Sequence, residues 1–218
     1  MMMKRLSLAI CLAFCTLGIS AQFAQHDDDT KYATDLVKPG TPAPDFKLKT
    51  PEGSDVRPTS DMVKEAIYSI IQFDIPGADV LDLFAGSGQL GIEALSRGAN
   101  HCVFVDKRAE SVALVRENVM TCGFLKQARI LTADSYDYLL TAKKGFDIAL
   151  LDPPYEQGLI QKVMERLPDK INDGGIVVCE HENELTLPEE FGSLKQHKRY
   201  KYGKIALTVY QKPALEEE

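Results

Sequence analysis

The stretch "ADVLDLFAGSGQLG", residues Ala78–Gly91, decides how this chain is expected to fold. Its first part, "ADVLDLF", is an apolar pattern typical of a buried strand, and "GQLGIEALSRG" continues as a helix that ends at Gly98. Between them stand Gly86 and Gly88, which together with Gly91 give the spacing G-x-G-x-x-G. Glycines at this spacing let the backbone turn tightly and approach a ligand. The stretch therefore predicts a ligand-binding strand, loop and helix of an open α/β sheet.

The segments around this stretch alternate between strand and helix patterns. Strands are expected at 101–106, 128–134, 147–152 and 175–182, and helices at 57–71, 109–123 and 159–168. Because such alternation is typical of a parallel, doubly wound sheet, the predicted fold class is α/β and Rossmann-like. The segment 195–212 does not follow this alternation of strands and helices. Its pattern predicts an antiparallel hairpin around Tyr202–Gly203 at the sheet edge.

The composition restricts the classes of function. The chain has 218 residues, 44% of them hydrophobic, which is enough for one α/β domain. Its net charge of −7 excludes a protein that grips nucleic acid over its whole surface, so any such contact needs a local basic patch. The five cysteines include no CxxC pair and no zinc spacing, so no metal site is expected. Cys102 and Cys179 stand in apolar strand patterns and are expected to be buried, reduced thiols.

The first quarter of the chain has a different character. Residues 1–21 have a basic start, an apolar run and a small-residue end, the pattern of a secretory signal peptide; the run is too short to predict stable membrane insertion. Residues 22–54 form a proline-rich leader whose "GTPAPDF" resembles the opening segment of exported thioredoxin-like proteins, without their reactive cysteine. The functional domain is therefore expected at 55–213.

Acidic residues stand at the ends of four expected strands: Asp82, Asp106, Asp134 and Asp152. Asp106 follows the glycine loop by about 20 residues, where a carboxylate binds the ribose of a dinucleotide, so an NAD-binding oxidoreductase is one interpretation. Asp82, however, would repel a pyrophosphate and suit a cationic group such as an ammonium. S-adenosylmethionine has an ammonium, a ribose and an adenine but no phosphate. In this second interpretation Asp134 accepts a hydrogen bond from the adenine amino group.

The motif "DPPY", Asp152–Tyr155, ends the strand before it. Pro153 and Pro154 remove ladder donors and restrict the backbone, so Asp152 and Tyr155 are held at the carboxyl end of the strand, where open α/β sheets bind ligands. Asp152 and the Pro153 carbonyl would accept the two N–H groups of an exocyclic amine, while Tyr155 stacks on an extruded base. The motif predicts methylation of a base amino group, with a simple tight turn as the alternative.

Residues from about Val56 to Gln211 resemble a known family. The matching segments, in order, are "RPTSDMVKEAIYSII", "VLDLFAGSGQLGIEALSRGA", "FVDKRAESVALVRENV", "DPPY" and "YGKIALTVY". Together they resemble the bacterial small-subunit ribosomal RNA guanine-N2 methyltransferases, the RsmD-like family. The second and fourth segments are shared by many amino-methyltransferases, and the first and last narrow the match.

This resemblance implies two adjoining sites. The donor site, for S-adenosyl-L-methionine, would comprise Asp82, Phe84, Gly86, Gly88, Asp106, Asp134 and Thr59. The acceptor site, for guanine, would comprise Asp152, Pro153, Pro154 and Tyr155, with Arg57 and Thr59 at its entrance. The implied substrate is ribosomal RNA in the assembling small subunit. A monomeric cytoplasmic enzyme without a metal is the corresponding expectation.

The leader stands where this family usually has a short basic strand pair that faces RNA. The remaining cationic candidates lie in the terminal hairpin, where Lys198 and Arg199 would form an RNA-phosphate patch or, alternatively, a solvated edge that discourages strand pairing. Three other functions stay open at this point: an amino-methyltransferase acting on DNA adenine, an NAD-binding oxidoreductase, and an inactive exported hybrid protein.

Overall fold

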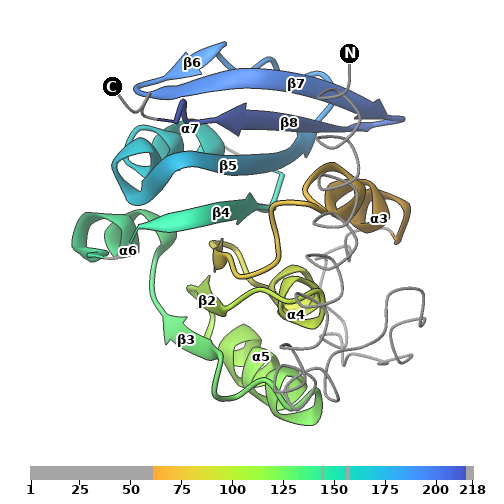
Figure 1. The fold of residues 1–218 in the computed structure, drawn as a ribbon, viewed down its shortest axis with the longest axis vertical. Helices are drawn as coiled ribbons and strands as arrows, with labels where there is room; N and C mark the ends of the chain where they lie inside the picture. The colour runs from red at the N-terminus through yellow and green to blue at the C-terminus, as the bar shows by residue number, and fades with distance from the viewer. Residues whose placement is uncertain (1–60, 144, 156–157, 215–218) are drawn as a thin grey trace, which may run out of the picture. The chain divides into compact units, whose positions relative to one another are not determined.

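The computed structural model describes residues 61–143, 145–155 and 158–214, and an eight-stranded sheet runs through this part (Figure 1). The functional domain expected at 55–213 is therefore described from Asp61 onward. The predictions for residues 1–21 and 22–54, and those for Arg57 and Thr59, lie outside the described residues.

The strands follow one another along the chain with helices between most of them. They are β1 (Asp79–Asp82), β2 (His101–Asp106), β3 (Ala128–Thr132), β4 (Phe146–Leu151), β5 (Ile171–Glu182), β6 (Glu190–Phe191), β7 (Leu194–Tyr202) and β8 (Ile205–Gln211). The α-helices are α3 (Asp61–Ile70), α4 (Gln89–Ser96), α5 (Ala109–Thr121), α6 (Ser135–Thr141) and α7 (Leu159–Met164), followed by the 3-10 helix η1 (Leu167–Lys170).

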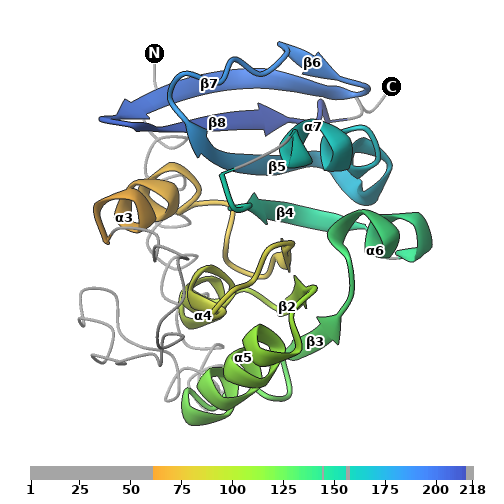
Figure 2. The same cartoon turned by 180° about the vertical axis from the view of Figure 1, so that it is seen from behind.

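The strand order across the sheet is β3-β2-β1-β4-β5-β8-β7-β6. β3, β2, β1, β4 and β5 are parallel to one another, whereas β8, β7 and β6 pair antiparallel (Figures 1 and 2). The chain builds outward from β1 to β3 and then returns to the other side of β1 with β4. The doubly wound α/β prediction and the antiparallel hairpin are confirmed. The strand order reverses between β1 and β4, which makes this the switch point of the sheet.

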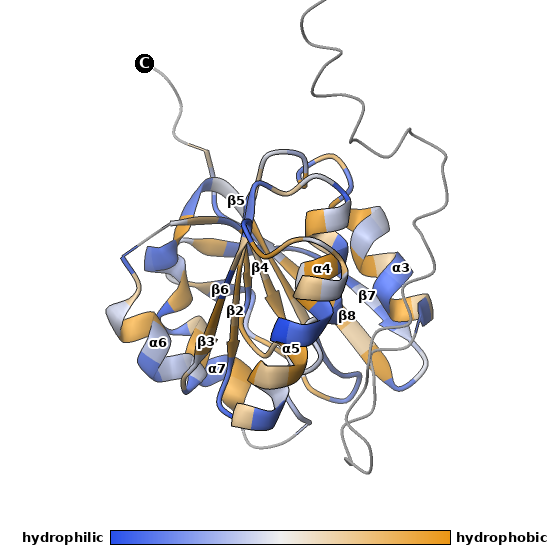
Figure 3. Cartoon of the chain, turned by 90° about the horizontal axis from the view of Figure 1, so that it is seen from below, coloured by the Kyte–Doolittle hydropathy of each residue, from blue (hydrophilic) through white to orange (hydrophobic). Residues whose placement is uncertain are grey.

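Helices cover both faces of the sheet because the buried strands are apolar on both sides (Figure 3). Neighbouring residues of β1 show the alternation: Val80 belongs to one buried cluster and Leu81 to the other. The first cluster takes side chains from α3, α4 and α5, and the second takes them from α6, α7 and η1. Cys102 and Cys179 are buried free thiols, as expected. The two buried clusters hold the helices against the sheet, and this packing fixes where the strand ends that form the site lie.

Three short elements were not predicted: α6, η1 and the two-residue strand β6. In α6, the sequence "SYDYLLT" has little periodicity, and the helix begins because the Asp134 side chain accepts hydrogen bonds from the backbone N–H groups of Tyr136 and Asp137. The strand β6 pairs with the outer side of β7. The edge of the sheet is therefore this short strand and not the predicted hairpin, which β7 and β8 form.

Candidate active site

The predicted donor and acceptor residues meet at the switch point between β1 and β4. Asp82 ends β1 and is the register partner of Leu150 in β4. Asp152 follows β4 immediately, because this strand ends at Leu151. Parallel strands end at the same edge of a sheet, so the glycine loop after β1 and the DPPY turn after β4 leave the sheet side by side. This edge is where open α/β sheets bind their ligands.

The backbone N–H groups of the glycine loop are occupied by acceptors of the protein itself. The Gly86 N–H donates to Asp106 Oδ2 at 2.9 Å, and the Gly91 N–H donates to Asp82 Oδ2 at 2.9 Å. The Gly88 N–H donates to the Ala85 carbonyl at 2.6 Å. A pyrophosphate-binding loop instead directs such N–H groups at the phosphates. The two carboxylates in their place argue against the NAD-binding interpretation.

The three glycines of the loop have different surroundings. Among the described residues, a Cβ added at Gly86, where φ is +54°, would find only the Phe84 carbonyl oxygen, 3.9 Å away. At Gly88 it would meet Val115 Cγ1 of α5 at 3.2 Å. At Gly91 it would overlap Phe104 Cε1 of β2 at 2.2 Å. Gly86 is therefore open toward a ligand, whereas Gly88 and Gly91 allow close packing against α5 and β2.

Asp106 is held rigidly at the end of β2. Only 9% of its surface is exposed, and its second carboxylate oxygen, Oδ1, accepts a hydrogen bond from the Arg108 backbone N–H at 2.8 Å. Each carboxylate oxygen has two acceptor lone pairs, so both keep capacity for a ribose hydroxyl. The open backbone at Gly86 beside this fixed carboxylate fits a ligand with an amino-acid end and a ribose.

Asp82 is almost fully buried, with 1% of its surface exposed. Burial raises the pKa of its carboxyl to about 7; the charges of Asp152 and Asp106 add to this shift, and the Gly91 N–H opposes it. The hydroxyl of Tyr68 in α3 donates to the Leu90 carbonyl in the first turn of α4, which ties that helix to the same region. The predicted contact of Asp82 with the donor ammonium stays a prediction, and its observed partner is the N-terminus of α4.

Asp134 and Phe84 flank the strand ends. Asp134 is exposed and lies two residues beyond Thr132, the register partner of Asp106. Its Oδ1 caps α6 by accepting from the Tyr136 N–H at 2.9 Å, which orients the carboxylate. Phe84 is half-buried and packs against the cluster under α6 and α7. Both positions are compatible with an adenine site, which stays a prediction.

The four residues of the DPPY turn differ in exposure. Asp152 is half-buried, Pro153 is buried, and Pro154 and Tyr155 are exposed, with 40% of the Tyr155 surface accessible. The Tyr155 hydroxyl donates a hydrogen bond to Glu180 Oε1 of β5 at 3.0 Å. The turn therefore does more than end a strand, because its aromatic side chain is tied to a neighbouring strand.

Glu180 is a site residue that sequence reasoning missed. It is 2% exposed, and its Oε2 has no hydrogen-bond partner among the described residues. Burial raises the pKa of its carboxyl to about 8, the Asp152 charge adds to the shift, and the Tyr155 hydroxyl opposes it. The signal that would have revealed it is the acid inside the apolar run "GIVVCEHE".

The two predicted cations of the hairpin have separate environments. Lys198 is exposed, and its Nζ lies 5.0 Å from the centre of the Tyr200 ring. Arg199 points to the other face, where its Nη2 donates to the Asn183 carbonyl at 2.7 Å and the Leu185 carbonyl at 3.5 Å. The joint phosphate patch stays a prediction: successive strand residues face opposite sides, and the Arg199 guanidinium contacts the loop after β5.

The described part of the chain has neither a cluster of metal ligands nor a helix that could span a membrane. Within residues 61–143, 145–155 and 158–214, no group of three or more His, Cys, Asp or Glu side chains is arranged to hold a metal ion. In the same part of the chain no helix has the length and apolarity required to cross a bilayer.

The glycine loop, the acids at the strand ends and the DPPY turn meet at one switch point of the sheet, and the fold is that of the Rossmann-like methyltransferases. The chain belongs to the family described as Conserved hypothetical protein 95, whose model matches residues 43–211. This match begins before residue 55, the predicted start of the domain.

Curated relatives and a solved structure agree with this membership. The putative rRNA methyltransferase YlbH of Bacillus subtilis is 38% identical over 170 residues, 76% of this chain and 92% of that protein. The ribosomal RNA small subunit methyltransferase D of Escherichia coli K12 is 33% identical, over 77% of this chain and 85% of that protein. The solved structure of the putative methyltransferase yhhF from Escherichia coli is 30% identical with a TM-score of 0.69, covering 77% of this chain and 92% of that one.

Proposed function

We propose that the protein transfers a methyl group from S-adenosylmethionine to the exocyclic N2 of a guanine in small-subunit ribosomal RNA. The observation that carries this proposal is the meeting of the glycine loop and the DPPY turn at the carboxyl ends of β1 and β4. The names of the relatives, rRNA methyltransferase and ribosomal RNA small subunit methyltransferase D, support the substrate class.

The donor side would be built from the loop and the three strand-end acids. Gly86 leaves the backbone open to the methionine end, and Asp106 accepts from the ribose hydroxyls with a carboxylate already fixed by two backbone N–H groups. Asp82 contributes negative potential near the loop, and Asp134 accepts from the adenine amino group. When bound, S-adenosylmethionine supplies an electrophilic methyl group on a sulfonium. Thr59 completes this set by family resemblance.

The acceptor side would orient a base amine. Asp152 and the Pro153 carbonyl accept the two N–H groups, which directs the nitrogen lone pair away from these acceptors and toward the donor side. Tyr155 and Pro154, both exposed, offer apolar surface on which the extruded base stacks. The protein then catalyses the transfer by orienting the base amine and by complementing the charge of the reactants, without a covalent intermediate.

The partner would be the assembling small ribosomal subunit, which places the protein in the cytoplasm as a monomer. The proposed phosphate contacts are Lys198, which is exposed on β7, and Arg57, which is included by family resemblance. Because the net charge is −7, the rest of the surface would repel RNA, so affinity should depend on few contacts.

Two measurements on the full-length chain test this function. Isothermal titration with S-adenosylhomocysteine should show binding, whereas NAD should show none; the reverse result would restore the oxidoreductase interpretation. Incubation with labelled S-adenosylmethionine and immature small subunits should then yield N2-methylguanosine in the digested RNA. Duplex DNA is the second substrate in the assay. If the duplex DNA gained labelled N6-methyladenine and the RNA gained no label, the DNA adenine methyltransferase alternative would replace the proposed function.

A further inference from the structure

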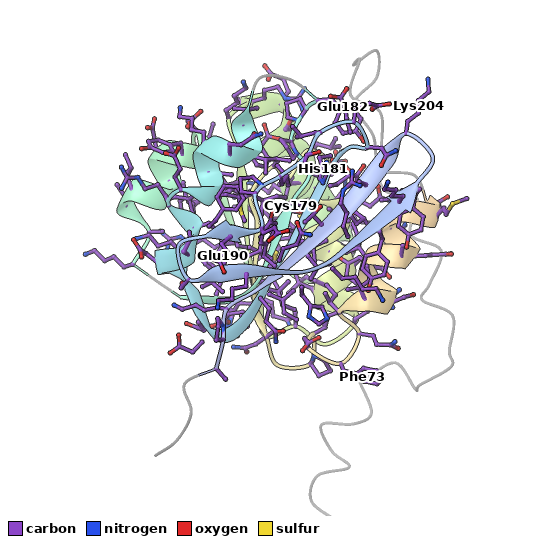
Figure 4. The ribbon with its side chains drawn as sticks, turned by 90° about the horizontal axis from the view of Figure 1, so that it is seen from above. Phe73, Cys179, His181, Glu182, Glu190 and Lys204 are labelled. Atoms are coloured by element: carbon purple, nitrogen blue, oxygen red, sulfur yellow. The ribbon has the colours of Figure 1, made fainter. Side chains whose placement is uncertain are left out.

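Glu180 and Tyr155 connect two neighbouring strand ends of the candidate active site. Tyr155 belongs to the turn after β4, and Glu180 lies in β5, one residue beyond Cys179, the register partner of Leu151. The 3.0 Å hydrogen bond from the Tyr155 hydroxyl to Glu180 Oε1 spans this gap. Figure 4 shows Cys179, His181 and Glu182 following one another along β5 toward the turn at Lys204.

The position of Glu180 is costly for a carboxyl group. Its side chain is 2% exposed, and Leu207 of β8, its register partner, lies beside it in the sheet. Burying a polar atom without a partner is destabilising, yet Oε2 is buried and unpaired among the described residues. Removing the acid would relieve that cost, so the stability of the sheet gives no reason to keep it there.

The group that gains from Glu180 is the tyrosine ring. Tyr155 is 40% exposed, and an exposed aromatic side chain loses rotamer freedom when it stacks on a ligand. A hydrogen bond at the far end of the ring holds the hydroxyl in place, and so restrains χ1 and the direction of the ring axis before the base arrives. Asp152 begins the same turn, so the ring is fixed relative to the carboxylate that receives the base amine.

We propose that Glu180 is a positioning residue, which holds Tyr155 in the orientation that stacks on the acceptor base while Asp152 receives the base amine. This inference rests on the proposed function and adds to it a residue on β5 for the acceptor side. Glu180 acts through Tyr155 on the acceptor side, so its role should be separable from S-adenosylmethionine binding.

The test uses four variants of the full-length chain. Tyr155→Phe keeps the stacking face and removes the hydroxyl, Glu180→Ala removes the acceptor, and Glu180→Gln keeps a neutral acceptor oxygen of the same size. Glu190→Gln is the control, since this exposed carboxylate pairs with Lys195 at 3.9 Å and lies level with Ile176 of β5 through the registers of β7 and β8 (Figure 4). The readouts are kcat, KM for small-subunit RNA, affinity for S-adenosylhomocysteine and thermal stability.

Tyr155→Phe and Glu180→Ala should each lower kcat by about 5- to 20-fold, the effect of one lost hydrogen bond, with KM changed less than about twofold. The double variant should lose no more than either single variant, because both remove one interaction. Glu180→Gln should restore kcat to within about threefold of the parent, and Glu190→Gln should match the parent. S-adenosylhomocysteine affinity should be unchanged throughout.

Three results would overturn the inference. Full kcat in Tyr155→Phe would show that the hydroxyl is not needed, even if Glu180→Ala fails to fold. Additive losses in the double variant would mean that the residues act separately. A failure of Glu180→Gln to rescue, with lowered thermal stability, would make Glu180 structural only. A failure of the proposed function is distinguishable, because then the parent chain itself would not bind S-adenosylhomocysteine or methylate RNA.

Discussion

The carboxylate of Asp106, at the end of β2, accepts a 2.9 Å hydrogen bond from the backbone N–H of Gly86 in the loop after β1. The same side chain holds the Arg108 N–H at the start of the segment leading into α5. One acid thus joins the glycine loop, β2 and the approach to the next helix. A ligand bound to this loop and to Asp106 would meet a surface that is already assembled.

Replacing Asp106 by Ala should weaken binding of S-adenosylhomocysteine by about 1.5–3 kcal/mol, because a charge-assisted bond to the ribose is lost. The loop should also lose order, since the Gly86 N–H loses its acceptor. Calorimetry measures the first effect, and faster hydrogen exchange at the loop measures the second. The control is Asp137→Asn, an exposed position on α6. Unchanged affinity in Asp106→Ala would remove this residue from the donor site.

Replacing Asp152 by Ala should abolish methyl transfer while donor binding survives. The carboxylate is expected to orient the acceptor amine, and one lost positioning group in a transition state costs about 10²-fold or more in rate. Single-turnover transfer to small-subunit RNA measures the rate, and calorimetry with S-adenosylhomocysteine measures donor binding. Turnover equal to that of the parent would refute the acceptor role of Asp152.

Gly91→Ala should destabilise the fold by about 3 kcal/mol, because the added methyl group overlaps Phe104 Cε1 at 2.2 Å and Cys102 Sγ at 2.6 Å. Gly123→Ala is the matched control: no atom of the described part of the chain lies within 4 Å of its added Cβ, and its φ of +81° is unfavourable, a cost of about 1 kcal/mol. Urea unfolding compares the two variants. Equal destabilisation would show that the close contact between α4 and β2 is not required.

The folded chain should lose stability as pH rises from about 4 to 7. The pKa of Asp82 is raised from 3.8 to about 7 in the fold, so in this window the folded state keeps a proton that the unfolded state releases. The free energy of unfolding therefore falls with pH until both states are ionised. The raised pKa of Glu180, about 8, acts in the same direction and extends the fall toward pH 8.

Asp82→Asn isolates the Asp82 contribution, because the amide keeps an acceptor for the Gly91 N–H and cannot ionise. The loss of unfolding free energy between pH 5 and 7.5 should shrink by at least about 1 kcal/mol in this variant, measured by urea unfolding at both pH values. Glu190→Gln serves as the exposed control and should follow the parent. A steeper pH dependence in Asp82→Asn than in the parent would contradict the buried, protonated carboxyl.

Replacing Lys198 should affect RNA binding, whereas replacing Arg199 should affect the stability of the fold. Lys198→Ala should reduce the dependence of RNA affinity on salt by about 0.7 in log–log slope, the value for one phosphate contact. Arg199→Ala should leave that slope unchanged and lower the unfolding free energy by about 1–2 kcal/mol, because the loop after β5 loses its donor. Binding is measured at several salt concentrations, with Lys195→Ala as a second exposed cation of β7. A smaller slope in Arg199→Ala alone would reverse these assignments.

The sequence was sufficient for the framework of the sheet. Apolar runs such as "DIALLD" and "HCVFVD" are long enough to identify buried parallel strands, and glycines mark where the chain leaves them. The positions of the acids at the strand ends could be predicted in the same way, because parallel strands all end at the same edge of the sheet. Asp82, Asp106 and Asp152 could therefore be assigned to one edge before any coordinates were known.

Pairwise contacts between distant segments could not be predicted in this way. Glu180 stands inside the apolar run of β5, but nothing in the local sequence shows that its partner is the Tyr155 hydroxyl of the turn after β4. Arg199 has the same local context as Lys198, and only the position of the Asn183 loop separates their roles. Periodicity determines which face a side chain takes, but what covers that face depends on residues far away in the chain.

The position of β8 links the completion of the sheet to the order in which the chain is synthesised. Among the described strands, β8 (Ile205–Gln211) comes last along the chain, yet it lies between β5 and β7 in the sheet. During synthesis β5 therefore keeps one edge unpaired until β7 and β8 have emerged, whereas Tyr155 and Glu180 have both been translated before then. The parallel half of the sheet, with its row of strand ends, is thus complete in sequence before the antiparallel half that closes the edge of β5.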